Sequence, residues 1–115
     1  MVFTKSLKGQ YRFKLTLKRG QYFSNKNITI YVLKNKKYEN GNFLGICVSK
    51  KHGNSVVRNR LKRWVREAYK EIEDSVEVGN NIIVLFKKNI NVDEIDFHLV
   101  KKELIEAIEK VGMNK

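Results

Sequence analysis

The chain has 115 residues, of which 42% are hydrophobic, and its 24 Lys and Arg against 12 Asp and Glu give a formal net charge of +12. This length fits a single domain, residues 1–115, and the hydrophobic share is too high for a disordered basic tail. The chain lacks both the roughly 18 consecutive apolar residues of a membrane span and the apolar run of a signal peptide. Its only cysteine, Cys47, cannot form an internal disulfide. These features predict a cytoplasmic protein that does not bind membranes.

The positive charge is concentrated in the first part of the chain. Residues 1–70 carry 18 Lys and Arg and two acids, a net charge of +16, whereas residues 71–115 carry six basic and ten acidic residues, a net charge of −4. Four of the six arginines lie at positions 58, 60, 63 and 66. Because a guanidinium binds phosphate oxygens in a bidentate way, this distribution predicts a surface that binds nucleic acid.

The first predicted elements are a helix and two strands. Residues 7–19 are typical of a short helix that ends at Gly20, with Phe13 and Leu17 on one face. Residues 27–33 and 43–49 have the β-branched and apolar character of strands. Because the polar connection between these strands is short, we expect them to pair antiparallel.

The next element is a basic amphipathic helix from residue 55 to about 74, for which Asn54 or Ser55 is the expected N-cap. At about 100° per residue, one side of this helix is apolar and is expected to face the core. That side comprises Val57, Leu61, Trp64, Val65, Ala68 and Ile72. The other side is polar and mainly basic, and comprises Asn59, Lys62, Arg63, Arg66 and Lys70, with Arg60 at its border.

The last predicted elements are a buried strand and a helix. Residues 81–86 form a continuous apolar run, which is typical of a central strand. We expect Asp93 to cap a final helix whose apolar stripe comprises Ile95, Leu99, Val100, Leu104, Ile105 and Ile108. The predicted order is therefore a helix, strands, a helix, a strand and a helix.

Aromatic residues gather near the amino terminus among several cations, in a pattern that suits single-stranded nucleic acid, whose bases stack on aromatic rings. Ordinary core packing explains such aromatics equally well. The rings are those of Tyr11, Phe13, Tyr22, Phe23 and Tyr31, and the cations are Lys8, Arg12, Lys14, Lys18 and Arg19.

The residues do not indicate a catalytic or metal centre on the chain itself. His52 and His98 have no Cys or carboxylate neighbours at the spacing of metal ligands. A protein-based nuclease needs paired carboxylates near its basic surface to hold Mg²⁺, but residues 1–70 contain only Glu39 and Glu67. We therefore predict an RNA binder with no catalytic residue of its own and no intrinsic cofactor.

The run from Val48 to Arg63, VSKKHGNSVVRNRLKR, resembles the signature of the bacterial ribonuclease P protein subunit. That signature reads V-S-K-K-x-G-x-A-V-x-R-N-R-x-K-R and is followed by an R-E pair, matched here by Arg66 and Glu67. Ser55 stands where alanine is usual. The resemblance extends over nearly the whole chain and includes Phe13, Leu17 and Gly20 at matching positions.

The resemblance implies one two-layer α+β domain of αβββαβα order, in which a mixed sheet is flanked by helices. It also implies a left-handed βαβ crossover, against the usual right-handed rule, in a fold shared with the second domain of a small-subunit ribosomal protein. The implied function is that of the RNA-binding subunit of ribonuclease P, which removes the 5′ leader from precursor tRNA. The chemistry then belongs to the catalytic RNA with Mg²⁺, bound mainly by that RNA.

Carried over residue by residue, the resemblance implies two binding sites. The catalytic RNA is expected to contact Lys50, Lys51, Arg58, Asn59, Arg60, Lys62, Arg63 and Arg66. The single-stranded leader is expected in a cleft between the first helix and the sheet, lined by Phe13, Leu17 and Tyr31. Leu17 stands where the family often has a second aromatic residue.

Two other classes of function are weighed against this one. Composition alone fits a structural RNA-binding protein of the ribosomal type, without a role in processing. A DNA-binding helix-turn-helix is disfavoured because a strand, and not another helix, precedes the basic helix. The expected partners are therefore the catalytic RNA and precursor tRNA, and not DNA.

Overall fold

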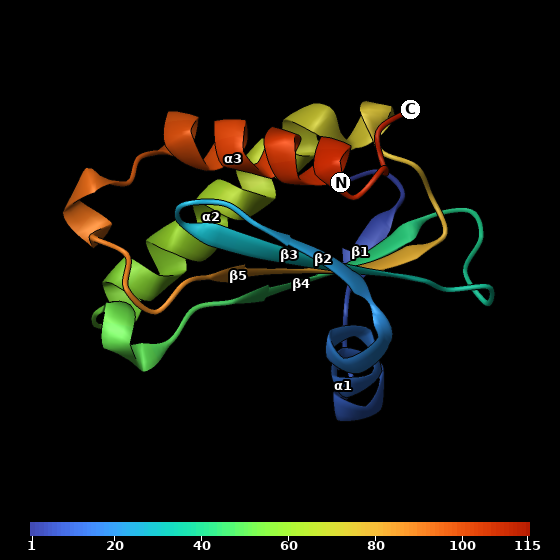
Figure 1. Ribbon diagram of the computed structural model, residues 1–115, viewed down its shortest axis with the longest axis horizontal. Helices are drawn as coiled ribbons and strands as arrows, with labels where there is room; N and C mark the ends of the chain where they lie inside the picture. The colour runs from blue at the N-terminus through green and yellow to red at the C-terminus, as the bar shows by residue number, and fades with distance from the viewer.

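The computed structural model describes all 115 residues, which form five strands and three α-helices (Figure 1). Their order is β1 (Thr4–Ser6), α1 (Gln10–Arg19), β2 (Gln21–Ser24), β3 (Ile28–Lys34), β4 (Asn42–Cys47), α2 (Ser55–Ile72), β5 (Asn80–Phe86) and α3 (Phe97–Lys110). Three short 3₁₀ turns, η1 (Lys50–His52), η2 (Glu73–Ser75) and η3 (Val92–Glu94), lie between these elements. The α+β class and the mixed sheet flanked by helices are as predicted.

The strands form one sheet in the order β1-β4-β5-β3-β2, with β5 at its centre as predicted. The predicted pairing of residues 27–33 with 43–49 is wrong, because β5 lies between β3 and β4, antiparallel to β3 and parallel to β4. The short connection fixes only the opposite directions of β3 and β4. A strand that is apolar on both faces suits the middle of a sheet whose two faces are covered by helices, and β5 occupies that place, with α1 on one face and α2 and α3 on the other (Figure 1).

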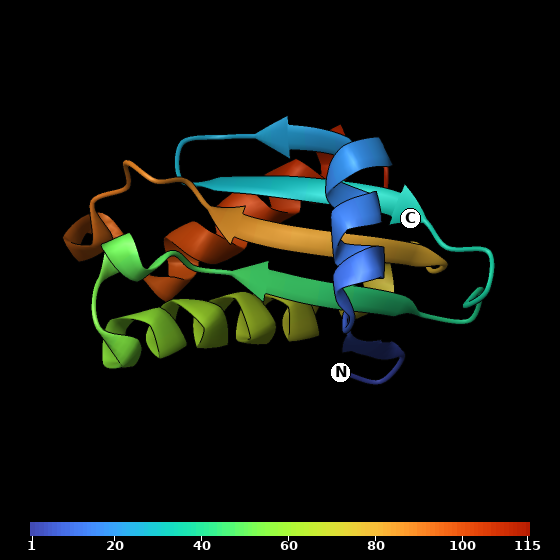
Figure 2. The ribbon, with the colours of Figure 1, turned by 90° about the horizontal axis from the view of Figure 1, so that it is seen from below.

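The connection from β4 through α2 to β5 is the left-handed crossover that the family resemblance implies. β4 and β5 are parallel neighbours, and α2 returns the chain behind the sheet as Figure 2 views it. In that view both strands point left and β5 lies above β4, which makes the turn left-handed. Most such connections are right-handed, so this topology is uncommon.

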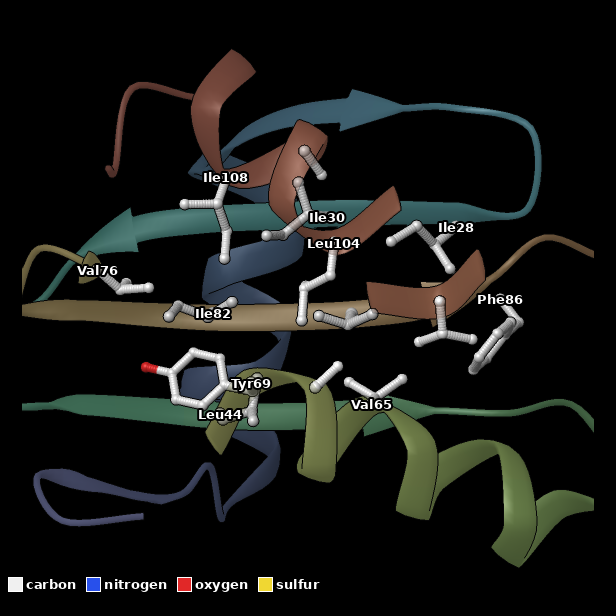
Figure 3. Packing of buried hydrophobic residues seen from close by; sticks show 14 of the residues in the cluster. Ile28, Ile30, Leu44, Val65, Tyr69, Val76, Ile82, Phe86, Leu104 and Ile108 are labelled. Carbon is white, nitrogen blue, oxygen red and sulfur yellow. The ribbon is translucent and has the colours of Figure 1, made fainter. Parts of the chain in front are cut away.

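The two faces of the sheet are covered unequally, by two helices on one face and by one helix on the other (Figure 1). Helices α2 and α3 pack together against one face, and between them and the sheet lies the main hydrophobic core (Figure 3). Ile28, Ile30 and Val32 of β3 point into this core. Helix α1 crosses the opposite face and covers only part of it (Figure 2). The alternate residues of each strand therefore lie on a face that is partly open.

The amino-terminal boundary differs from the prediction. The first helix begins at Gln10 and not at residue 7, because Gly9 has a φ of 91° that breaks the helical path. Thr4–Ser6 instead form β1, which pairs parallel with β4. Gly20 caps the helix as predicted, and a Cβ at this position would lie 2.5 Å from the Thr16 carbonyl oxygen. Only glycine therefore fits where the chain turns back into the sheet.

The start of the last helix also differs. The prediction that Asp93 caps it is wrong, because Asp93 lies in η3 and the cap of α3 is Asp96. The Asp96 carboxylate accepts a hydrogen bond from the Leu99 backbone N–H at 2.8 Å. Val100, Leu104 and other members of the predicted stripe are buried.

Candidate nucleic-acid interface

The segment before α2 is held by a closed set of local hydrogen bonds. In η1, the Ser49 hydroxyl accepts a hydrogen bond from the Lys51 N–H, and His52 Nδ1 accepts one from the Ser49 N–H at 3.1 Å. The Asn54 side chain then caps α2 by accepting from the Val57 N–H, as predicted. The backbone that carries Lys50 and Lys51 is therefore fixed relative to the helix that follows.

His52 ties this segment to the end of β5. Its ring is buried, and because Nδ1 accepts from a backbone N–H, Nε2 carries the hydrogen and donates to the Lys87 carbonyl oxygen at 2.9 Å. The ring also meets Phe86 edge to face. His52 is thus a structural residue, and no signal in the sequence distinguished this role from that of an isolated surface histidine.

The apolar side of α2 faces the core as predicted. Leu61, Val65 and Ala68 are fully buried, and Val57, Trp64 and Ile72 pack against the same cluster. The prediction missed Tyr69, which is also fully buried and continues the four-residue spacing of Leu61 and Val65. That spacing is the signal that could have identified it.

Tyr69 anchors the end of α2 to the first strand. Its hydroxyl lies 2.9 Å from Thr4 Oγ1 and accepts a hydrogen bond from Asn42 Nδ2 at 3.2 Å. The buried Glu73 carboxylate, just beyond the helix, accepts from the Val2 N–H at 2.6 Å. Both ends of α2 are therefore fixed, which holds its outer side in one orientation.

The outer side of α2 carries the predicted basic residues, and almost none of them has an acidic partner. The only ion pair among them joins Arg63 to Glu67 at 3.8 Å, and both side chains are largely exposed. An exposed pair of this kind contributes little stability. Lys50 and Lys51 of η1 and Asn59, Arg63 and Arg66 of α2 are exposed, whereas Arg58, Arg60 and Lys62 of α2 are half-buried. We call these eight residues the α2 basic surface.

Two arginines of this surface are held by packing against the protein. The Arg60 guanidinium lies over the Trp64 ring, 5.4 Å from its centroid, which is a favourable cation–π geometry. The Nε atoms of Arg58 and Arg60 are buried and have no hydrogen-bond partner in the protein. The two side chains are therefore positioned without having their charge neutralised, as suits binding to an external anion.

The second predicted site lies on the sheet face that α1 covers in part. Tyr31 of β3 pairs with Ile83 of β5, which pairs with Gly45 of β4, so these three residues form one row across the sheet. A Cβ on Gly45 would lie 3.6 Å from Phe13 Cε2, so the Phe13 ring packs over the middle of β4. Helix α1 brings Leu17 to the same side one turn later, and Phe13, Leu17 and Tyr31 are all half-buried.

The aromatic residues near the amino terminus separate into different environments. Tyr22 of β2 lies directly opposite Tyr31, with ring centroids 5.7 Å apart. Phe23, the next residue, packs against the main core. Tyr11 is 78% exposed and lies about 200° around α1 from Phe13, away from the sheet. We call Phe13, Leu17 and Tyr31 the sheet-face site.

The half-buried Cys47 is the last residue of β4. Cys47 lies in the row next to Tyr31, on the same face of the sheet. Burial raises the pKa of the Cys47 thiol above its ordinary value, and the positive charge of Lys62 on α2 lowers that pKa in part.

The structure shows no group of three or more His, Cys, Asp or Glu side chains arranged to hold a metal ion. None of the helices is both long and apolar enough to span a lipid bilayer.

Comparisons with known proteins agree on one family. The family model described as Ribonuclease P matches residues 1–112. The chain belongs to the ribonuclease P protein family. The "Ribonuclease P protein component" of Listeria welshimeri is 40% identical over 100 residues, which cover 87% of this chain and 81% of that protein. The corresponding protein of Natranaerobius thermophilus is 37% identical over 105 residues, which cover 91% and 88%.

Solved structures of the family have the same fold. The RNase P protein of Staphylococcus aureus superposes with a TM-score of 0.84 at 26% identity and covers 98% of each chain. The RNase P protein of Thermotoga maritima gives 0.82 at 29% identity, covering 92% of this chain and 96% of that one. The family resemblance found in the sequence is therefore confirmed. Membership makes the chain a component of an endoribonuclease complex of tRNA processing that includes an RNA partner.

Proposed function

We propose that this chain assists the catalytic RNA of ribonuclease P by binding two RNA elements at two separate places. The α2 basic surface binds the catalytic RNA. The sheet-face site binds the single-stranded 5′ leader of precursor tRNA. The observation that carries the proposal is the group of six unpaired cations on α2 and on the turn just before it, with both ends of the helix fixed to the fold.

The α2 basic surface suits a structured RNA backbone. Six of its seven cations have no ion pair in the protein, so no internal salt bridge has to break when phosphates bind. Each phosphate contact releases condensed counterions, which favours binding at moderate salt. His52 and Asn54 fix one end of α2, and Tyr69 fixes the other. The protein therefore loses little conformational entropy when RNA binds.

The sheet-face site suits a single strand. Tyr31 and Phe13 offer aromatic surface on which bases stack, at roughly 1–3 kcal/mol per base by alanine substitution. Leu17 adds apolar contact beside them. Stacking is tolerant of sequence because every base has a π-face, so this site can accept the leaders of different precursor tRNAs.

We propose that cleavage takes place on the RNA and that Mg²⁺ is held mainly there. Mg²⁺ prefers carboxylate oxygens in proteins. The α2 basic surface contains none, and the two carboxylates of α2, Glu67 and Glu71, are already paired with Arg63 and Lys101. The protein's contribution is then electrostatic and positional. Its cations reduce the repulsion between the two RNAs, and the sheet-face site adds affinity for the leader.

Reconstitution tests this function. The protein is added to a bacterial ribonuclease P RNA at low Mg²⁺ concentration, and cleavage of a precursor tRNA is measured. The proposal predicts that the protein stimulates cleavage at the junction between leader and mature tRNA. A structural RNA-binding protein without a processing role would leave the rate unchanged, and would co-purify with ribosomal subunits instead of the catalytic RNA.

A further inference from the structure

Tyr22 is an exposed aromatic residue that the sheet-face site, as described above, leaves unused. It lies on the four-residue edge strand β2, and 68% of its surface is accessible to solvent. No other strand residue with an aromatic ring is exposed to this extent. A ring that is mostly in water gains little from the hydrophobic effect, and its cross-strand pairing with Tyr31 is worth roughly 0.2–1 kcal/mol. Most of the surface of the ring is therefore free to meet a ligand.

The position of Tyr22 relative to Tyr31 is well defined. The two residues are directly paired between β2 and β3, so their side chains emerge on the same face of the sheet. Their ring centroids are 5.7 Å apart, and the ring planes are inclined by 31°. The neighbouring pair, Ser24 and Thr29, is joined by a hydrogen bond of 2.6 Å between the two hydroxyls, which fixes the register of the edge strand.

The row of paired residues that begins with Gly45, beneath α1, therefore continues to the edge of the sheet. From β4 to β2 it consists of Gly45, Ile83, Tyr31 and Tyr22. Ile83 is fully buried, whereas Tyr31 is half-buried and Tyr22 is exposed, so the two tyrosines are the side chains of the row that solvent reaches. The two rings together form an aromatic surface about twice as long as Tyr31 alone would offer.

The charges near Tyr22 in the chain are positive. Lys18 and Arg19 precede it and Lys26 follows it, and all three are exposed. Glu103 and Glu106 of α3 contact Asn25 and Asn27, beyond the end of β2, and neither forms an ion pair with these three cations. Aromatic rings beside free cations are the arrangement that binds single-stranded nucleic acid, since bases stack on the rings while cations meet the phosphates.

We infer that Tyr22 and Tyr31 form a two-ring stacking platform, and that Tyr22 binds a base of the single-stranded leader beyond the base at Tyr31. This inference rests on the proposed function, because it assigns a further contact to the same leader. It predicts that the preference for leader-bearing substrates depends on Tyr22 only when the leader is long enough to reach β2.

The test compares Tyr22→Ala and Tyr22→Phe in the reconstituted holoenzyme. Tyr11→Ala is the matched control, because Tyr11 is also a largely exposed tyrosine and lies about 200° around α1 from Phe13. Dissociation constants are measured for mature tRNA and for precursor tRNAs whose leaders are lengthened one nucleotide at a time. Precursors with a single 2-aminopurine at successive leader positions report stacking through fluorescence quenching.

Tyr22→Ala should weaken binding of the long-leader precursor about fivefold or more, the lower end of the stacking range, and leave mature tRNA unchanged. Tyr22→Phe should retain the affinity, and quenching at one leader position should disappear in Tyr22→Ala alone. Wild-type binding by Tyr22→Ala, or an equal loss in Tyr11→Ala, would overturn the inference and leave the proposed function standing. A wild-type holoenzyme that binds leader-bearing and mature tRNA equally would overturn both.

Discussion

Replacing Arg60 by alanine gives a quantitative test of the α2 basic surface. Arg60 has no acidic partner, and its guanidinium is held over Trp64. If its charge contacts one phosphate, its loss makes the slope of log K against log salt shallower by about 0.7–0.9. The seven cations of the surface together would give a slope of about −5 to −6 if each makes such a contact.

The same contact sets the change in affinity. Extrapolated from 1 M salt, a slope difference of about 0.7–0.9 makes Arg60→Ala roughly five- to eightfold weaker than wild type at about 0.1 M salt. The lost cation–π contact costs about 0.5–1 kcal/mol of stability at a partly exposed site, which thermal unfolding measures separately. The helix itself should therefore stay folded at the temperature of the binding assay.

The assay is filter binding of labelled catalytic RNA over a series of salt concentrations. Lys102→Ala is the matched control, because it removes one exposed cation from α3, outside the proposed surface. The control should keep the wild-type slope. An unchanged slope in Arg60→Ala, or an equal change in both variants, would show that the reasoning about the α2 basic surface is wrong.

Three further predictions concern the sheet face and the core. Tyr31→Ala should weaken binding of leader-bearing precursor tRNA and spare mature tRNA; an equal loss for both would contradict the leader assignment. Tyr69→Phe leaves the buried Thr4 hydroxyl without a partner and removes one hydrogen bond of Asn42, so urea unfolding should show about 1–3 kcal/mol lower stability. Burial also raises the pKa of Tyr69, and hydrogen bonds from Thr4 and Asn42 lower it only in part. The stability that the neutral Tyr69 side chain contributes is therefore complete below pH 10 and is lost as the pH rises through the pKa of Tyr69 in the folded protein. Raising the pH above 10 should therefore destabilise wild type more than Tyr69→Phe. Because the pKa of Cys47 is raised from 9.0, Cys47 should react more slowly than free cysteine with a thiol-modifying reagent at pH 8. Binding of leader-bearing RNA should slow this reaction further.

The basic helix could be predicted in detail because its information is local. The period of apolar residues from Val57 to Ile72 and the cap at Asn54 are properties of consecutive residues, and both agree with the structure. The contrast between the two sides of the helix needs no knowledge of the rest of the fold. The same holds for the central strand, whose apolar run indicates burial on both faces.

The order of the strands could not be predicted from local pattern. A short connection between two strands usually means a hairpin, but here β5 lies between β3 and β4 after a left-handed crossover. Pairing is decided by which arrangement buries the most apolar surface over the whole sheet. β1 was missed for a related reason, since its three residues are stabilised by pairing with β4 and not by their own pattern.

In the candidate sites too, some residues could be identified from local sequence, whereas the roles of others depend on the whole fold. Arg58, Arg60 and their neighbours were identified from charge and spacing. Tyr22 was identified only as one of several aromatics, and its place beside Tyr31 follows from the register between β2 and β3. The roles of His52 and Tyr69 depend on partners 35 and 65 residues away in the chain, which no short motif records.

The central claim is that the α2 basic surface, on a correctly folded protein, enables the catalytic RNA to work at low Mg²⁺. The most direct measurement is the single-turnover rate of precursor tRNA cleavage by the catalytic RNA alone, with wild-type protein, and with a triple variant in which Arg58, Arg60 and Arg66 are alanine. The account predicts strong stimulation at low Mg²⁺ by wild type, little by the triple variant, and convergence of the three rates at high Mg²⁺. Equal stimulation by a folded triple variant, or none by wild type, would contradict it.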